Sequence, residues 1–136
     1  FCTALKPFAF RYLFGRGHGR VLYFDPDIAV FAPLTTLFAR LQTAAVVLTP
    51  HVCSLQTHYT GMVPEGLLLH VGTFNCGFVG MANTPAGGQV LDWWENRLTT
   101  QCYADKTDGL HTDQKWMDML PALLPEGLHI ERGLGY

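Results

Sequence analysis

The sequence predicts an α/β domain in which a mainly parallel sheet is flanked by helices. Strand-like and helix-like segments alternate along the chain, which is the pattern of strands connected by crossover helices. Residues 21–24 form a continuous apolar run, as expected of a strand buried on both faces. The 136 residues are 49% hydrophobic and 15% charged, which suits one packed domain over 1–136.

The first part of the chain is expected to fold as helix, strand, helix and strand. Apolar residues at helical spacing predict a helix over residues 2–14, and a glycine-rich turn separates it from the strand at 21–24. Pro33 suits the first turn of a second helix, whose apolar positions include Leu37. A second buried strand is expected at residues 44–49.

The later part continues this alternation. Residues 53–67 lack a clear period and are expected to form a loop, which leads to a third strand at 74–81 and a helix at 89–98. Another helix is expected to begin at Thr112 as its N-cap. The side chains expected on its inward face are Trp116, Met119 and Leu120. A short strand at 128–130 ends the pattern.

Composition narrows the classes of protein to which the chain can belong. The net charge is −2 and no basic run occurs, so we expect no nucleic-acid partner. No apolar segment reaches the roughly 18 residues of a membrane span. The four cysteines form no C-x-x-C motif, which predicts buried, reduced thiols and a cytoplasmic location. The alternative is that they pair in a secreted protein. The sequence begins directly with a helical pattern and stops shortly after a predicted strand. We therefore expect a domain that is incomplete at both ends.

The motif Asp25-Pro26-Asp27 directly follows the apolar run at 21–24. Ligands of open α/β sheets bind beyond the carboxyl ends of the strands, and residues two apart in an extended chain point to one side. Two carboxylates held together repel unless a cation joins them, and their hard oxygens favour Mn²⁺ or Mg²⁺. The alternative is an ordinary turn, because Asp and Pro are common turn residues.

These residues resemble a known family. The segment VLYFDPDIAVFAPL resembles the DXD region of GT-A glycosyltransferases, which transfer a sugar from a nucleotide-diphosphate donor. TFNCGF and TDQKW resemble, in the same order, the FNxG strand and the DQ segment of the glycogenin-like retaining branch. LKPF and DWWENRL are similar to uncharacterised bacterial glycosyltransferases. The resemblance covers nearly the whole chain and implies a GT-A (Rossmann-like) nucleotide-diphospho-sugar transferase fold.

The resemblance implies roles for the residues around the Asp motif. Asp25 and Asp27 would hold Mn²⁺ (or Mg²⁺), and Asp25 would also contact the donor. Asn75 would contact the donor sugar or its phosphates, and Gly77 would allow close approach. The family takes its third metal ligand, usually a His, from a segment beyond this sequence, and His129 is not assigned to that role. For Asn75, the alternative is that it satisfies backbone groups at a strand end.

The resemblance also implies roles for the DQ segment and the first helix. Asp113 would bind donor-sugar hydroxyls, Gln114 would lie near the anomeric carbon, and Lys6 would contact the donor phosphates. The alternatives are a helix N-terminus that favours Asp113, a surface position for Gln114 and a solvated helix face for Lys6. His51 follows a predicted strand, so it is a further candidate for donor binding in the same crevice.

The sequence therefore predicts a metal-dependent, hexosyltransferase-like glycosyltransferase. It would move a sugar from a nucleotide-diphosphate donor to an unknown acceptor (a glycan, lipid or protein), and the resemblance implies retention of anomeric configuration. Two alternatives stay open. One is a metal-dependent phosphohydrolase or nucleotidyltransferase that uses the same Asp pair. The other is a non-catalytic module that binds a sugar or nucleotide.

Overall fold

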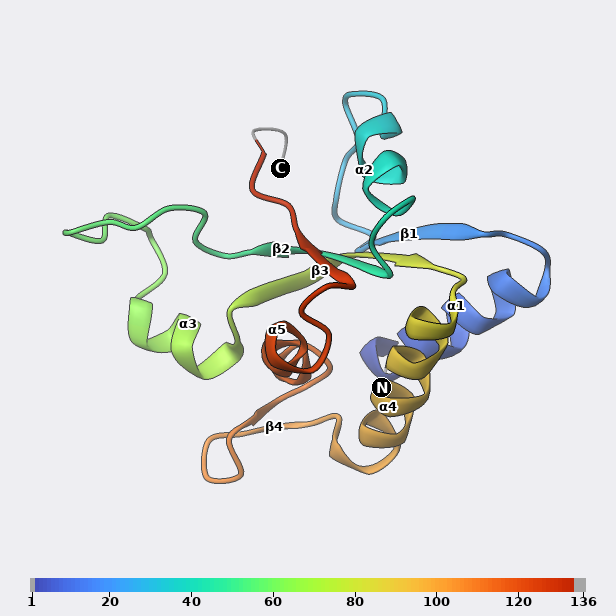
Figure 1. The fold of residues 1–136 in the computed structure, drawn as a ribbon. Helices are drawn as coiled ribbons and strands as arrows, with labels where there is room; N and C mark the ends of the chain where they lie inside the picture. Colours follow the sequence, from blue (N-terminus) through green and yellow to red (C-terminus); the bar gives the residue numbers. More distant parts are fainter. Residues whose placement is uncertain (1, 134–136) are drawn as a thin grey trace.

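The computed structural model describes residues 2–133 of the chain, so the predicted domain extends beyond it by residue 1 and residues 134–136. It is an α/β domain built around a four-stranded sheet with the order β1-β3-β2-β6 (Figure 1). The strands of this sheet are β1 (Arg20–Phe24), β2 (Val46–Pro50), β3 (Phe74–Ala82) and β6 (Leu128–Ile130). Each of the strands predicted from the sequence is therefore present.

The sheet is mixed, so the prediction of a mainly parallel sheet is wrong. Strand β3 is antiparallel to both of its neighbours, β1 and β2, whereas β2 and β6 are parallel. It follows that β1, β2 and β6 share one direction and that β3 runs against them. The reversal arises because the segment between β2 and β3, which includes α3 (Glu65–Val71), returns at the same end of the sheet instead of crossing its face (Figure 1).

Strand β1 lies at an edge of the sheet, so its prediction as a doubly buried strand is also wrong. Within the described residues β1 pairs with β3 alone, and its last four residues are half-buried. The apolar run still has a structural reason, because Tyr23 packs against one hydrophobic cluster and Phe24 against another on the opposite face. Strand β2 is the one that is buried along its whole length.

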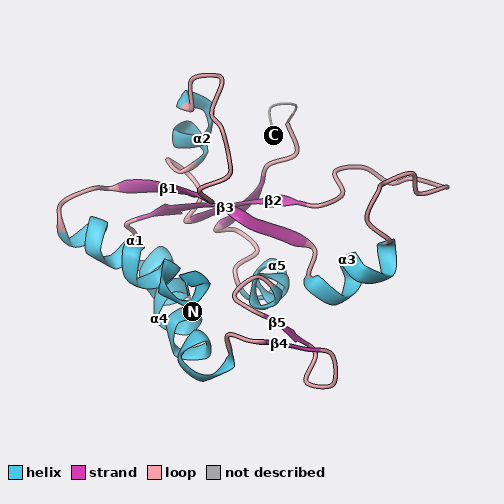
Figure 2. Ribbon diagram, turned by 180° about the vertical axis from the view of Figure 1, so that it is seen from behind, coloured by secondary structure: helices cyan, strands magenta, loops and turns pink. Residues whose placement is uncertain are grey.

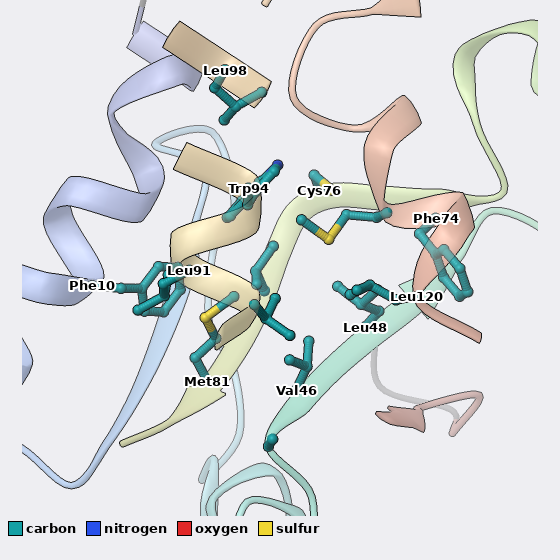
Figure 3. Packing of buried hydrophobic residues seen from close by; sticks show 14 residues of the cluster. Phe10, Val46, Leu48, Phe74, Cys76, Met81, Leu91, Trp94, Leu98 and Leu120 are labelled. Atoms are coloured by element: carbon teal, nitrogen blue, oxygen red, sulfur yellow. The ribbon is translucent and has the colours of Figure 1, made fainter. Parts of the chain in front are cut away.

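Helices cover the two faces of the sheet unequally (Figure 1, Figure 2). On one face lie α1 (Lys6–Gly15), α4 (Pro85–Gln101) and α5 (Leu120–Leu123), and on the other lies α2 (Thr35–Arg40). Alternate residues of β2 divide between the faces, as the period of a strand requires. Val46 and Leu48 join the larger cluster with Trp94, while Val47 joins the smaller cluster with Leu37 (Figure 3).

The helices differ from the sequence prediction mainly at their ends. The first turn of the N-terminal helix is a separate 3-10 helix, η1 (Cys2–Leu5), and α2 begins two residues after Pro33. Helix α4 covers the predicted range and extends beyond it at both ends. Helix α3 overlaps the end of the predicted loop at 53–67. A two-stranded hairpin of β4 (Ala104–Asp105) and β5 (Leu110–His111) was not predicted.

The helix predicted from Thr112 is replaced by a 3-10 helix, η2 (Lys115–Met119), followed directly by α5. Thr112 has a φ of 50°, which is unfavourable for a β-branched residue and incompatible with the N-cap role. Because a 3-10 helix has three residues per turn, the inward set changes. Met117 and Leu120 are buried, whereas Met119 is exposed and Trp116 is partly buried.

Two further predictions concern the state of the thiols and membrane-spanning segments. All four thiols are free and Cys76 is buried, but Cys2 and Cys53 are exposed, so the prediction of buried thiols is wrong for these two. Within residues 2–133, no helix combines the length and the apolar character that a membrane crossing requires.

Two neighbouring glycines, Gly87 and Gly88, test how the start of α4 packs against the end of β3. A Cβ on Gly87 would collide with the carbonyl oxygen of Ala82, whereas a Cβ on Gly88 meets nothing within 4 Å. We expect Gly87→Ala to lower the free energy of unfolding by roughly 1–3 kcal/mol through overpacking. Gly88→Ala should raise it by up to about 1 kcal/mol, because Ala is the better helix former. Urea unfolding of both variants measures this; equal effects would contradict the described start of α4.

Candidate functional site

A buried ammonium group lies at the centre of the candidate site. The side chain of Lys6 is 3% exposed, so the alternative of a solvated helix face is wrong. Its Nζ donates a hydrogen bond to the backbone oxygen of Cys76 at 2.7 Å and lies 2.9 Å from Asp113 Oδ2. Asp25 Oδ1 is 3.7 Å away, and the ring of Tyr23 lies 4.7 Å below the charge. One lysine thereby links α1, β3, the end of β1 and the DQ segment.

Asp25 lies at the end of β1 with its side chain 37% exposed. Its backbone N–H donates to Gly77 O at 2.8 Å, and the Tyr23 hydroxyl donates to its Oδ1 at 2.7 Å. Burial, together with this bond to a carboxylate, raises the pKa of Tyr23, so the phenol stays protonated and remains a donor. Tyr23 was not predicted from the sequence, although its position two residues before Asp25 places both on one side of an extended chain.

Asp25 and Asn75 meet at the backbone of Gly77. A Cβ on Gly77 would lie 2.9 Å from Asn75 Oδ1 and 3.2 Å from Asp25 Oδ2. Asn75 Oδ1 accepts a hydrogen bond from the Gly77 N–H at 2.8 Å, which is the backbone role considered as the alternative for this residue. The structure thus brings together three of the predicted site residues. The contact of Asn75 with a donor stays a prediction.

The DQ segment is tied into the core on the other side of Lys6. Trp94 Nε1 donates to the backbone oxygen of Asp113 at 3.1 Å. Gln114 accepts from Cys76 N at 3.0 Å through its amide oxygen and donates to Val71 O at 3.1 Å through its amide nitrogen. Gln114 is therefore a bridge between α3 and β3, and the alternative of an ordinary surface residue is wrong. Its position near an anomeric carbon stays a prediction.

Asp113 is buried, with 2% of its surface exposed, which a role limited to a helix N-terminus does not explain. Its Oδ2 is close enough to Lys6 for an ion pair, yet the direction of approach does not make a hydrogen bond, and this oxygen has no hydrogen-bond partner within residues 2–133. Contact of Asp113 Oδ2 with a donor sugar requires the ion pair with Lys6 to open. The same holds for contact of Lys6 with donor phosphates.

Asp27 and His51 are placed less tightly. Asp25, Pro26, Asp27 and Ile28 do form a turn, which the Ile28 N–H closes on Asp25 O at 3.0 Å, and Asp27 is exposed on it. A turn and a metal site are compatible, because both carboxylates remain accessible. Among the described residues, no group of three His, Cys, Asp or Glu side chains gathers to hold a metal. His51 follows β2, and its Nδ1 lies 3.0 Å from Gly72 O.

Comparison with known proteins gives one distant relative. The chain is 25% identical over 130 residues to the uncharacterised protein YfnF of Bacillus subtilis (strain 168). The aligned part is 92% of this chain and 42% of YfnF, so the chain spans less than half of that relative's length. No family model matches the sequence, and no solved structure gives a significant match.

The buried pair of Lys6 and Asp113 predicts a large effect on stability. In Lys6→Met the carboxylate of Asp113 remains buried without its cation, which should lower the free energy of unfolding by roughly 3–5 kcal/mol. Adding Asp113→Asn removes the uncompensated charge and should recover part of that loss. The control is Lys115→Met, which removes a more exposed pair with Asp118 and a hydrogen bond to Leu69 O, and it should cost clearly less than Lys6→Met. Chemical denaturation of all four proteins measures this, and similar losses for Lys6→Met and Lys115→Met would contradict it.

Proposed function

We propose that this chain is part of a metal-dependent GT-A-type glycosyltransferase that uses a nucleotide-diphosphate sugar. The observation that carries the proposal is the meeting of Asp25 and Asn75, which are far apart in the sequence, at the side-chain-free backbone of Gly77. Three segments that resemble family motifs supply the residues on and around this point. A glycine at this position lets the Asn75 and Asp25 side chains close over the backbone, so that two polar groups from distant parts of the chain lie together.

The donor set suits a hard divalent cation. Asp25 and Asp27 offer carboxylate oxygens at an accessible turn, which favour Mn²⁺ or Mg²⁺ over softer metals. Two carboxylates leave coordination positions open for the oxygens of a diphosphate. The chemistry that such a cation supplies is neutralisation of the charge on the departing nucleoside diphosphate.

The residues of the chain then orient the reactants. Asn75 holds the donor beside Gly77, and Tyr23 and Lys6 hold the Asp25 carboxylate in place. In the transfer, the bond between the anomeric carbon and the diphosphate oxygen breaks, a bond from the acceptor hydroxyl oxygen to the anomeric carbon forms, and the hydroxyl proton passes to the departing diphosphate. Gln114 is proposed to lie beside the anomeric carbon and Asp113 beside the sugar hydroxyls. The outcome proposed from the family resemblance is retention of configuration.

The proposal is tested by Mn²⁺ binding, followed by electron paramagnetic resonance on the full-length protein with and without nucleoside diphosphates. We expect one nucleotide to tighten Mn²⁺ binding, and Asp25→Asn/Asp27→Asn to abolish it. Glu126→Gln, which removes one exposed carboxylate elsewhere, is the control and should bind as the wild type does. Mn²⁺ that stays free in the folded full-length protein would show that the Asp pair is only a turn.

Turnover assays separate the proposed reaction from its alternatives. Asp27→Asn should retain the fold and lose metal-dependent turnover, because the residue is exposed on the turn. A glycosyltransferase releases a nucleoside diphosphate, whereas a phosphohydrolase or nucleotidyltransferase releases phosphate or pyrophosphate. Full turnover by the Asp27→Asn variant would contradict the proposed metal-dependent glycosyltransferase.

Gly77 provides an independent test of the same site. In Gly77→Ala the added methyl group would crowd Asn75 and Asp25, so nucleotide affinity should fall about tenfold, the equivalent of 1.4 kcal/mol. Gly88→Ala serves as the matched control, since its methyl group meets open space. Isothermal titration calorimetry with the nucleotide found above measures both. Unchanged affinity in Gly77→Ala would mean that Asn75 and Asp25 do not hold the nucleotide.

A further inference from the structure

An apolar cavity of about 410 Å³ lies between the loop that follows β1 and the chain that follows β6. It is on the same side of the sheet as α2 (Figure 1). The large apolar side chains that line it are Phe24, Ile28, Val30, Phe31, Leu34 and Leu37. Its size falls within the about 300–1,000 Å³ of small-molecule sites, which are also mainly apolar with a few polar groups.

Several of the lining side chains are exposed together. Phe31 is 94% exposed, Val30 is 52% exposed and Ile28 is 42% exposed. A lone apolar residue on a surface is ordinary, whereas neighbouring ones that share a cavity indicate a binding site. Phe31 in particular contacts so little of the protein that packing does not account for its position.

The polar groups of the cavity wall are already satisfied. The Glu131 carboxylate lies 3.3 Å from both Arg40 Nε and His129 Nε2, and it accepts the Gly133 N–H at 2.8 Å. Burial alone would raise the pKa of Glu131, but the bonds from Gly133, Arg40 and His129 lower it, so the group stays ionised and paired. With its one carboxylate compensated in this way, the mainly apolar wall suits an uncharged apolar group.

The cavity adjoins the proposed reaction site. Phe24 directly precedes Asp25, and the Ile28 N–H is hydrogen-bonded to Asp25 O. Asp25 Oδ2 and Ile28 Cδ1 lie 3.2 Å and 3.5 Å from one point, the position of a Cβ on Gly77. The side chain of Ile28, which lines the cavity, is therefore also close to the Asp25 carboxylate.

From this juxtaposition we propose that the cavity binds an apolar aryl or alkyl group of the acceptor, next to the hydroxyl that receives the sugar. The assignment rests on the proposed function, because it takes the Asp25 side of the cavity as the place of transfer. The proposed acceptor is uncharged and carries an apolar substituent. A purely polar sugar would leave the cavity unfilled.

The test compares phenyl β-D-glucoside with methyl β-D-glucoside in ligand-detected NMR on the full-length protein. We expect the phenyl compound to bind the more tightly, with saturation transferred most strongly to its ring protons. Phe31→Ala should weaken its binding about tenfold through loss of apolar contact. Leu55→Ala is the matched control, since Leu55 is as exposed as Phe31 but does not line the cavity.

Several outcomes would overturn the inference. One is equal binding of the two glucosides, and another is equal effects of Phe31→Ala and Leu55→Ala. A third is a wild-type dimer that Phe31→Ala converts to a monomer without changing glucoside binding, since the cavity is then an interface between copies.

Mn²⁺ and nucleotide binding are measured on the same samples. If these bind normally and the phenyl glucoside does not, the inference fails alone. If the phenyl glucoside binds while Mn²⁺ does not, the acceptor role falls together with the proposed function.

Discussion

The ammonium group of Lys6 is removed from water, and the surrounding structure is arranged to compensate for it. An isolated buried charge costs far more than any single packing contact contributes, so it persists only among opposite charges and carbonyl dipoles. Asp113 and the carbonyl of Cys76 provide those partners at 2.9 Å and 2.7 Å. Helix α1, strand β3 and the segment after β5 therefore have to occupy fixed positions around one atom.

The same requirement gives a reason for the unusual backbone of Thr112. Residues in the left-handed region store strain that surrounding contacts must offset. Here the next residue, Asp113, reaches Lys6 with its carboxylate and receives the Trp94 indole N–H on its backbone oxygen. The strain at Thr112 thus accompanies the placement of the Asp113 carboxylate in the core. It indicates that the segment after β5 does more than connect two elements.

Sequence patterns predicted the positions of the strands far better than their pairing. The apolar runs at β1, β2 and β3 are local signals, whereas the insertion of β3 against β1 and β2 depends on where a long connection returns. Burial of Lys6 was missed for a similar reason. A lysine on a helix is usually solvated, and the carboxylate that balances it lies more than a hundred residues away. Asp25 was singled out because it follows an apolar run, whereas Asn75 and Gly77 were singled out by the resemblance of their segment to the FNxG strand. They lie close to Asp25 because the start of antiparallel β3 is beside the end of β1.

The order of strands in the sheet also bears on how the site comes into being during synthesis. Asp25 leaves the ribosome about fifty residues before Gly77, and within the described residues the sheet partner of β1 is β3. Such non-local pairing is slow to form, because the intervening chain must first give up its freedom. Until then the apolar strand β1 lacks the pairing with β3. The candidate site is therefore a late product of folding, and a nascent chain that stalls before β3 carries β1 without that pairing, as an aggregation-prone edge.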